Sequence, residues 1–138
     1  MTEDLQIAKL DNPAWEVIGQ GITAYNTQQA GEDDGQNLCF VLKTPDGEIV
    51  GGVIGATYWG WLYVNLMWLR DDLRGRGYGK ELLTLAEDEA RQRGAKQSYL
   101  DTFSFQALGF YQKQGYEIFG QLDDFPPGHQ RYFLRKKL

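Results

Sequence analysis

The residues best suited to chemistry lie between positions 74 and 80, where Gly75, Gly77 and Gly79 fall within five residues. An uncharged, strand-like run precedes this stretch, and an amphipathic helical pattern follows it. The first amides of a helix have no intrahelical partner, and the helix dipole is positive at that end. The sequence therefore predicts a site for an anion such as a pyrophosphate, with Arg76 or Lys80 adding positive charge.

Two other phosphate-binding motifs do not fit this loop. A dinucleotide fingerprint requires Gly-x-Gly-x-x-Gly, and the third glycine is missing in both possible registers. A Walker A loop requires Ser or Thr after Gly-Lys, but Glu81 stands there. The pattern that remains is Arg74-x-x-Gly77-x-Gly79 between a strand and a helix. The alternative is an ordinary glycine-rich turn that binds nothing, because glycines also serve packing.

The elements that must position this loop follow from the spacing of the apolar residues. Asn12 before Pro13 indicates the N-cap of a first helix. The turn from Thr44 to Gly47 predicts a hairpin. The predicted fold class is α/β, a mixed and mostly antiparallel sheet flanked by helices, in the order β-α-β-β-β-α-β-α-β-β. Strands are predicted at residues 5–10, 38–43, 48–58, 61–70, 97–103, 116–122 and 131–138, and helices at 12–29, 80–93 and 106–114.

The run from Ile49 to Leu69 contains no charged residue, and its length alone would satisfy a membrane span. Its glycines, β-branched residues and aromatic residues favour two buried strands joined near Trp59-Gly-Trp61 instead. In the second of these strands, alternation predicts two faces. One face would carry Leu62, Val64, Leu66 and Trp68, and the other Tyr63, Asn65, Met67 and Leu69.

Composition restricts the class of protein. With 138 residues and 42% hydrophobic content, the chain suits a single domain over residues 1–138. A net charge of −5 argues against nucleic acid as a main partner. One cysteine and one histidine give no zinc pattern and no internal disulfide, so no metal is expected. The acidic first residues lack a signal-peptide segment, which predicts a cytoplasmic protein that does not span the membrane.

A second motif follows the glycine loop by about thirty residues. Ala107, with the run Phe110-Tyr-Gln-Lys-Gln-Gly-Tyr116, places Tyr111 on a short helix directly after the strand expected to pair with strand 61–70. Taken with the glycine loop, this motif resembles the GCN5-related N-acetyltransferase (GNAT) superfamily. The resemblance covers roughly Ile49 to the C-terminus and is specific for the superfamily rather than for a substrate.

The resemblance implies acetyl-CoA as the acetyl donor and assigns roles to particular residues. Leu69 would hold the pantetheine through its backbone, and its N–H would face the thioester oxygen if strand pairing is broken locally. Tyr111 matches the tyrosine that protonates the departing thiolate. Ser104 stands where the family commonly has an asparagine that contacts the pantetheine arm. The pyrophosphate would lie on the amides of Arg74, Gly75, Arg76, Gly77, Tyr78 and Gly79, with Lys80 opening the helix.

The general base is less well defined. No carboxylate lies between Trp61 and Leu69, so Asp101 on the neighbouring strand is the best single candidate. A chain of water molecules is the alternative base, and a cap or a salt bridge is the alternative role for Asp101. His129 suits proton transfer by its chemistry, although a surface loop histidine is the simpler interpretation. Cys39 is expected to be buried, which argues against a covalent acetyl-cysteine.

Aromatic side chains near the central hairpin and acidic loops suit a cationic amine acceptor, although hairpin packing explains the same residues. The candidate acceptor-binding residues are Tyr25, Trp59, Trp61 and His129. The sequence thus predicts an N-acetyltransferase that acts on a small-molecule or protein amine by direct attack in a ternary complex, as a monomer or homodimer. The alternative is a non-catalytic sensor that binds acyl-CoA.

Overall fold

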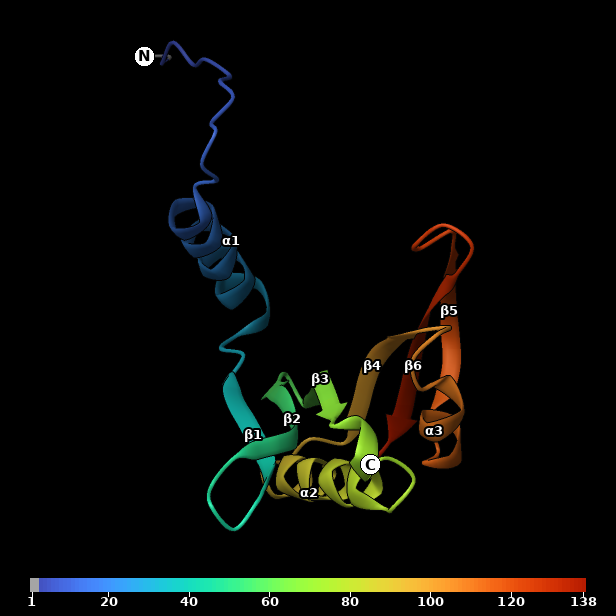
Figure 1. The fold of residues 1–138 in the computed structure, drawn as a ribbon. Helices are drawn as coiled ribbons and strands as arrows, with labels where there is room; N and C mark the ends of the chain where they lie inside the picture. The colour runs from blue at the N-terminus through green and yellow to red at the C-terminus, as the bar shows by residue number, and fades with distance from the viewer. Residues whose placement is uncertain (1–2) are drawn as a thin grey trace. The chain divides into compact units, whose positions relative to one another are not determined.

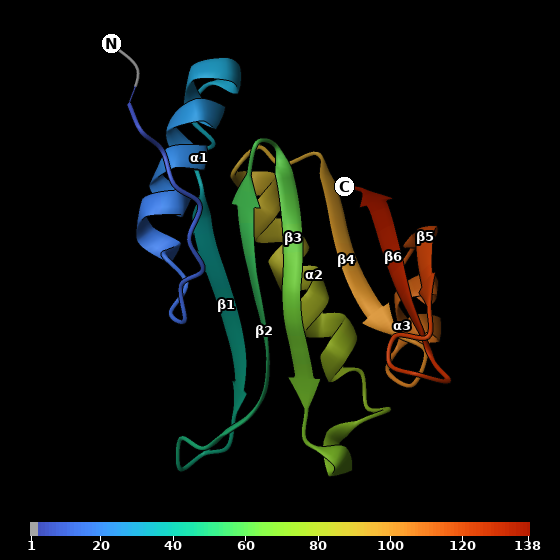
Figure 2. The same cartoon turned by 90° about the horizontal axis from the view of Figure 1, so that it is seen from above.

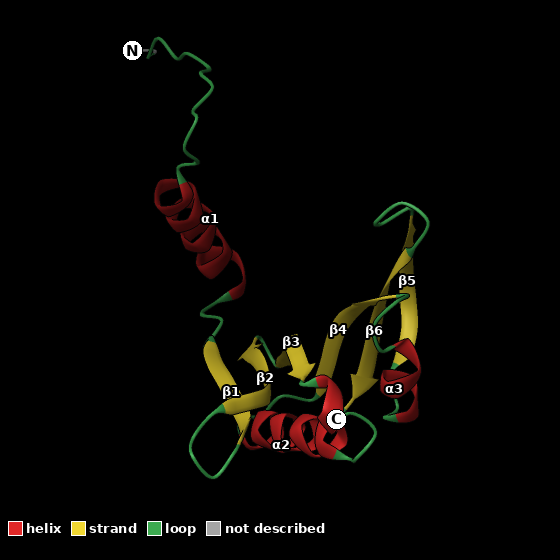
Figure 3. Ribbon diagram, in the orientation of Figure 1, coloured by secondary structure: helices red, strands yellow, loops and turns green. Residues whose placement is uncertain are grey.

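The computed structural model describes residues 3–138, so the first two residues of the acidic start lie outside the described part. The chain separates into two compact units, one ending at Asp33 and one from Asp34 to Leu138. The elements are shown in Figures 1 and 3. They are α1 (Trp15–Ala30), β1 (Gln36–Lys43), β2 (Ile49–Tyr58), β3 (Trp61–Leu69), the 3₁₀ turn η1 (Asp71–Leu73), α2 (Tyr78–Gln92), β4 (Gln97–Phe103), α3 (Leu108–Lys113), β5 (Glu117–Asp123) and β6 (Gln130–Lys137).

The first unit differs from the prediction in two respects. Residues 5–10 form no strand, because a short and weakly alternating segment needs a paired neighbour and all six strands of the sheet lie between residues 36 and 137. The helix begins at Trp15 with Ala14 at its N-cap position and has no side-chain cap. Asn12 is therefore too far from the first free amides to cap them, and that prediction was wrong.

The second unit is built on one sheet with the strand order β1-β2-β3-β4-β6-β5. Only β3 and β4 pair in parallel, and every other neighbouring pair is antiparallel. The turn between Thr44 and Gly47 closes the predicted β1–β2 hairpin through a 2.9 Å hydrogen bond. The uncharged run from Ile49 to Leu69 forms two strands, as predicted, and none of the helices among residues 3–138 is long and apolar enough to cross a membrane.

Both helices of the second unit cover the same face of the sheet, as Figure 2 shows with α2 and α3 behind the strands. Leu82, Leu83, Ala86 and Ala90 recur at helical spacing on α2 and are buried against the strands. They meet inward-facing residues such as Leu62 in one hydrophobic core. The opposite face of the sheet carries many partly exposed aromatic side chains.

A buried polar cluster connects α2 to β4 and β6. The Tyr116 hydroxyl lies 2.8 Å from Glu87 Oε2 and 2.8 Å from Ser98 Oγ. Lys136 Nζ donates to both carboxylate oxygens of Glu87 at 3.0 Å. Burial, and then the charge of Glu87, raises the pKa of Tyr116. Because Tyr116 follows α3 directly, this cluster also sets the position of α3 against α2.

The sheet contains glycines at points where strands approach too closely for a side chain. A Cβ at Gly55 would lie 2.5 Å from the backbone oxygen of Tyr63. We expect Gly55→Ala to lower the free energy of unfolding by about 3 kcal/mol, because a backbone atom cannot move away cheaply. Gly109→Ala is the control, since its Cβ would meet nothing within 4 Å and alanine favours a helix. Urea unfolding measures both, and equal stabilities would contradict this account.

Candidate functional site

The glycine loop joins β3 to α2, and its three positions need a glycine for different physical reasons. Gly75 and Gly77 adopt φ values of 74° and 89°, and an added Cβ would meet nothing within 4 Å at either position. Backbone conformation therefore requires glycine there. Gly79 is buried, and its Cβ would lie 3.3 Å from Phe110 and 3.6 Å from Leu69. Close packing between α2, α3 and the end of β3 requires glycine at this third position.

The loop presents a row of backbone donors. Within residues 3–138, the amides of residues 75–80 donate no hydrogen bond, and the N-cap residue Gly77 provides no side-chain cap. Arg74 is paired with Asp71 at 3.3 Å, whereas neither Arg76 nor Lys80 has a carboxylate partner in this part of the chain. Six free amides and two cations without a carboxylate partner at a helix N-terminus suit a pyrophosphate chemically, and the role of these residues stays a prediction.

Strand β3 contains a bulge that the sequence did not reveal. Ile54 pairs with Leu66 and Gly55 pairs with Val64, so Asn65 is the extra residue. The bulge exchanges the two faces of β3 beyond this point, and the predicted faces were wrong there. Leu66 and Trp68 are 61% and 53% exposed, while Met67 and Leu69 pack on the core with Leu62.

The sheet also opens next to this bulge. The pairing of β3 with β4 runs from Trp61 with Gln97 only as far as Val64 with Leu100, and the two ribbons diverge beyond it (Figure 2). The Arg70 amide donates to Val50 on β2 at 2.9 Å. Because amides along a strand point alternately to its two edges, the Leu69 N–H points away from β2, into this split. Leu69 thus has the locally broken pairing that an oxyanion donor requires.

Tyr111 on α3 is 8% exposed and lies among Phe110 and Tyr116, with both ring contacts near-perpendicular. Its hydroxyl makes no hydrogen bond within residues 3–138. No fully buried side-chain oxygen or nitrogen of these residues lacks a partner, so the hydroxyl reaches accessible space. Burial, and then the negative charge of Asp101, raises the pKa of Tyr111 to about 12. The residue is therefore a protonated donor at neutral pH.

Asp101 stands on β4 one position past the last residue paired with β3. Its Oδ2 accepts a hydrogen bond from Arg131 Nε at 2.8 Å and forms an ion pair with Arg131 Nη2 at 2.7 Å. The Arg131 guanidinium lies 5.1 to 5.5 Å from the ring centroids of Phe103, Phe125 and Phe133. The salt bridge considered as an alternative role for Asp101 is therefore present, and it fixes the orientation of the carboxylate.

Ser104 and His129 lie together at the same end of the sheet as the split. Ser104 Oγ accepts from the Gln130 amide at 3.1 Å and lies 3.5 Å from His129 Nδ1. His129 also meets the ring of Phe105 edge-on, with the centroids 5.0 Å apart. Both side chains thus connect the end of β4 to the loop before β6.

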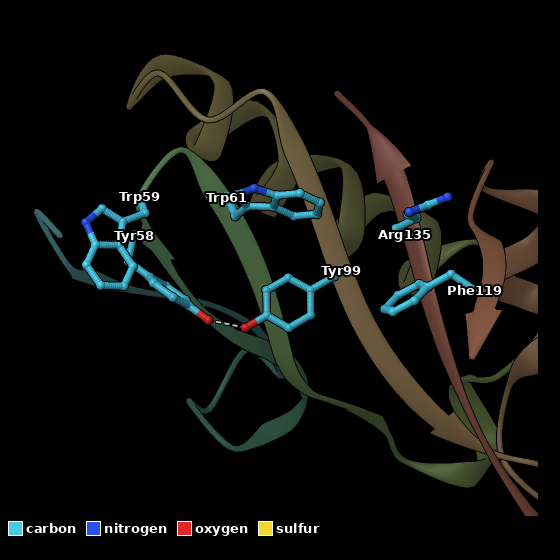
Figure 4. Close-up of a pocket in the computed structure, with 6 residues that line it drawn as sticks. All are labelled: Tyr58, Trp59, Trp61, Tyr99, Phe119 and Arg135. Atoms are coloured by element: carbon cyan, nitrogen blue, oxygen red, sulfur yellow. Dashed lines mark hydrogen bonds between the residues drawn. The ribbon is translucent and has the colours of Figure 1, made fainter. Parts of the chain in front are cut away.

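Trp59 and Trp61 lie at the far end of β3. Trp61 and Leu69 are eight positions apart, which corresponds to roughly 26 Å of strand. The two tryptophans line a cavity of about 460 Å³ on the face of the sheet opposite α2 and α3 (Figure 4). We call it the aromatic pocket, and it is lined by Tyr58, Trp59, Trp61, Tyr99, Phe119 and Arg135. Tyr25 belongs to the first unit, on α1.

Two single residues, Cys39 and Arg131, differ from what the sequence predicted. Cys39 is exposed, so the expectation of a buried cysteine was wrong. It lies on the edge strand β1, where Leu38 takes the buried face and Cys39 the opposite one. Arg131 was missed entirely, although the alternating Arg131, Phe133 and Arg135 could have indicated a strand face that meets Asp101.

Comparison with known proteins agrees with this geometry. Residues 5–116 match the model of the acetyltransferase (GNAT) family. An acetyltransferase of Agrobacterium fabrum is 35% identical over 127 residues, which is 92% of this chain and 93% of the relative. A blasticidin-S acetyltransferase of Streptomyces morookaense is 42% identical over 67% of this chain and 68% of its own. The crystal structure of an acetyltransferase from Bacillus cereus superposes with a TM-score of 0.86 at 33% identity, covering 95% and 98% of the two chains.

A split mixed sheet beside a glycine-rich strand–helix loop, together with these matches, defines an acetyltransferase that uses acetyl-CoA as the acetyl donor. The chain belongs to the GNAT family. The predicted superfamily, fold class and donor are thereby confirmed.

The backbone of Gly77 provides a test of the loop. Alanine at φ 89° costs about 1–2 kcal/mol. Without a ligand, residue 77 of the Gly77→Ala variant can leave this strained backbone conformation. Binding must then restore the conformation, so we expect the Kd for acetyl-CoA to rise about 5- to 30-fold. Gly94→Ala is the matched control, because Gly94 has the same φ of 89° at the other end of α2. Calorimetry measures both, and equal Kd values in the two variants would contradict the predicted role of the loop.

The pKa of Tyr111 predicts a loss of stability at alkaline pH. An exposed tyrosine ionises near pH 10, whereas Tyr111 in the fold holds its proton to about pH 12. This contribution is fully present below pH 10 and is lost as the pH rises toward 12. Between about pH 9 and about pH 11, the free energy of unfolding should fall by about 1 kcal/mol more in the wild type than in Tyr111→Phe. Parallel slopes in urea titrations would contradict this.

Proposed function

We propose that the protein transfers the acetyl group of acetyl-CoA to a primary amine by direct attack in a ternary complex. The observation that carries this proposal is the row of free amides at residues 75–80 beside a split that exposes the Leu69 N–H. The first of these features suits a pyrophosphate, and the second suits a thioester carbonyl. Both lie at the same end of β3.

The chain offers separate groups for each part of the donor. The amides of Gly75 to Lys80 would hold the pyrophosphate, with charge from Arg76 and Lys80. The split between β3 and β4 would take the extended pantetheine arm along the unpaired edge near Leu69. Ser104 lies at the end of β4, and its hydroxyl already accepts from the Gln130 amide. Ser104 would therefore contact the pantetheine as a hydrogen-bond donor, through its hydroxyl proton.

Acetyl-CoA supplies an acetyl group bound to sulfur as a thioester, which an amine displaces. The amine nitrogen forms a bond to the carbonyl carbon, the carbon–sulfur bond breaks, and the amine loses one proton while the thiolate gains one. The Leu69 N–H would donate to the carbonyl oxygen as negative charge develops there. Tyr111 would donate to the departing sulfur. A thiol is a stronger acid than Tyr111, so this hydroxyl stabilises the thiolate chiefly as a hydrogen-bond donor.

For the amine, Asp101 is a fixed acceptor at the point where the split begins. The hydrogen bond and the ion pair with Arg131 both use Oδ2, which leaves Oδ1 available to orient an attacking nitrogen. We propose that Asp101 acts in this way and that proton removal runs through water. His129, at the same end of the sheet, is the second candidate for proton transfer.

The catalytic reading is favoured over a non-catalytic acyl-CoA sensor because the relatives that match over most of the chain are acetyltransferases. The family match spans residues from both units, which supports a single domain. A small-molecule or protein amine as acceptor, a cytoplasmic location, a monomeric or homodimeric state and the absence of nucleic acid as a partner stay predictions from the sequence.

Tyr111→Phe tests the enzyme against the sensor. Removing one general acid or donor typically costs about 10²- to 10⁴-fold, so we expect kcat to fall by about 10² with an unchanged Kd for acetyl-CoA. Thiol release in an amine panel measures kcat, and calorimetry measures the Kd. Turnover within a few-fold of wild type would remove Tyr111 from the mechanism. No turnover by the wild type with any amine, despite acetyl-CoA binding, would favour the sensor.

A further inference from the structure

The aromatic pocket is not used by any step assigned so far. Its volume of about 460 Å³ is in the range of small-molecule sites. Trp61 meets Tyr99 edge-on with centroids 5.8 Å apart, and Tyr63 stacks on the other side of Tyr99 at 4.8 Å. The hydroxyls of Tyr58 and Tyr99 are hydrogen-bonded to each other across the pocket (Figure 4). These contacts hold the rings in fixed orientations.

The pocket lies on the same face of β4 as Asp101. Tyr99 and Asp101 are two residues apart on β4, so they share a face and are separated by about 7 Å. The split between β3 and β4 begins after Leu100, between these two positions. The charge of Asp101 also raises the pKa of Tyr63, after the larger effect of burial. A molecule that extends about 7 Å from Tyr99 along this face would meet Asp101, where the split begins.

The charges between the aromatic pocket and Asp101 determine which class of ligand fits there. Arg135 lines the pocket, but its Nε lies 3.3 Å from Glu117 and its guanidinium lies 5.5 Å from the Phe119 ring centroid. Arg131 is likewise paired with Asp101. Both cations have anionic partners, so the pocket has no free charge for an acid. Asp101 Oδ1 has no hydrogen-bond partner among the described residues, so it can accept a hydrogen bond from a ligand.

We propose that the acceptor is a primary amine that carries an aromatic ring, with the ring in the aromatic pocket against Trp61 and Tyr99 and the nitrogen at Asp101 beside the split. This inference rests on the proposed function and names the class of its acceptor. The nitrogen, once neutral, bonds to the acetyl carbon as the carbon–sulfur bond breaks, giving an aryl-alkyl acetamide and CoA thiol. A ring bound in the aromatic pocket also gives Trp59 and Trp61 a role in binding the acceptor, although they lie far from Leu69.

The test is a series of phenylalkylamines, from phenylmethylamine to phenylpentylamine, each compared with the alkylamine of the same chain length. One aromatic pair contributes roughly 2- to 12-fold in binding, so kcat/KM should favour the phenyl compound by at least that factor at the best chain length. In Trp61→Leu this preference should fall toward one, and Trp61→Phe should restore most of it. The shift in melting temperature caused by acetyl-CoA checks that each variant folds and binds the donor.

A second measurement uses the wild-type protein alone. Because Trp59 and Trp61 line the pocket, phenylpropylamine should change the intrinsic fluorescence in a saturable manner, and propylamine at equal concentration should not. Equal kcat/KM for phenyl and alkyl amines, or a preference that survives Trp61→Leu, would overturn this inference and leave the proposed function intact. Failure of every amine to react, despite acetyl-CoA binding, would overturn both.

Discussion

Strand β3 is hydrogen-bonded along both edges for its first half and along one edge for its second. Backbone N–H groups are obligatory donors, and a protein leaves a row of them unpaired only where water or a ligand completes the bonding. The bulge at Asn65 directly follows the last pair between β3 and β4, which is Val64 with Leu100. The side chains of β3 therefore exchange faces at the point where β3 stops pairing with β4. The reacting end of the site depends on this one transition.

The split persists because other contacts hold the two sides of the sheet. Helix α2 packs beneath the strands on both sides of it, and the cluster of Glu87, Ser98, Tyr116 and Lys136 ties α2 to β4 and β6. Removing one member would leave a buried polar group unsatisfied, which is costly. The opening at β3 is thus a consequence of rigid packing around it.

Local patterns predicted the six strands within two residues, because each has its own alternation and turn chemistry. The glycine loop was predictable for the same reason, since its residues are contiguous. The bulge was not, because Asn65 continues an unbroken alternation and becomes an extra residue only when β2 is aligned against it. Residues 5–10 show the reverse error, in which a weak alternation has no strand to pair with.

The acceptor side of the site was less predictable because its residues are distant in sequence. Asp101 and Arg131 meet only because β4 pairs with β6, with thirty positions between them. Side-chain alternation predicted the two faces of strand 61–70 only, and nothing in the sequence placed strand 131–138 beside strand 97–103. Tyr58 and Tyr99 came together through the same sheet order, and no short motif contains both.

The contact between Gly79 and Phe110 has a consequence for the order of events at the site. Gly79 lies in the first turn of α2, in the segment that would hold the pyrophosphate, and Phe110 is the neighbour of Tyr111 on α3. The two lie so close that even a methyl group at position 79 would press on the ring. A displacement of the loop toward α3 on binding the donor would therefore push on the helix that carries Tyr111. Such mechanical coupling would let the donor complete the catalytic arrangement before the amine arrives, which corresponds to an ordered kinetic scheme.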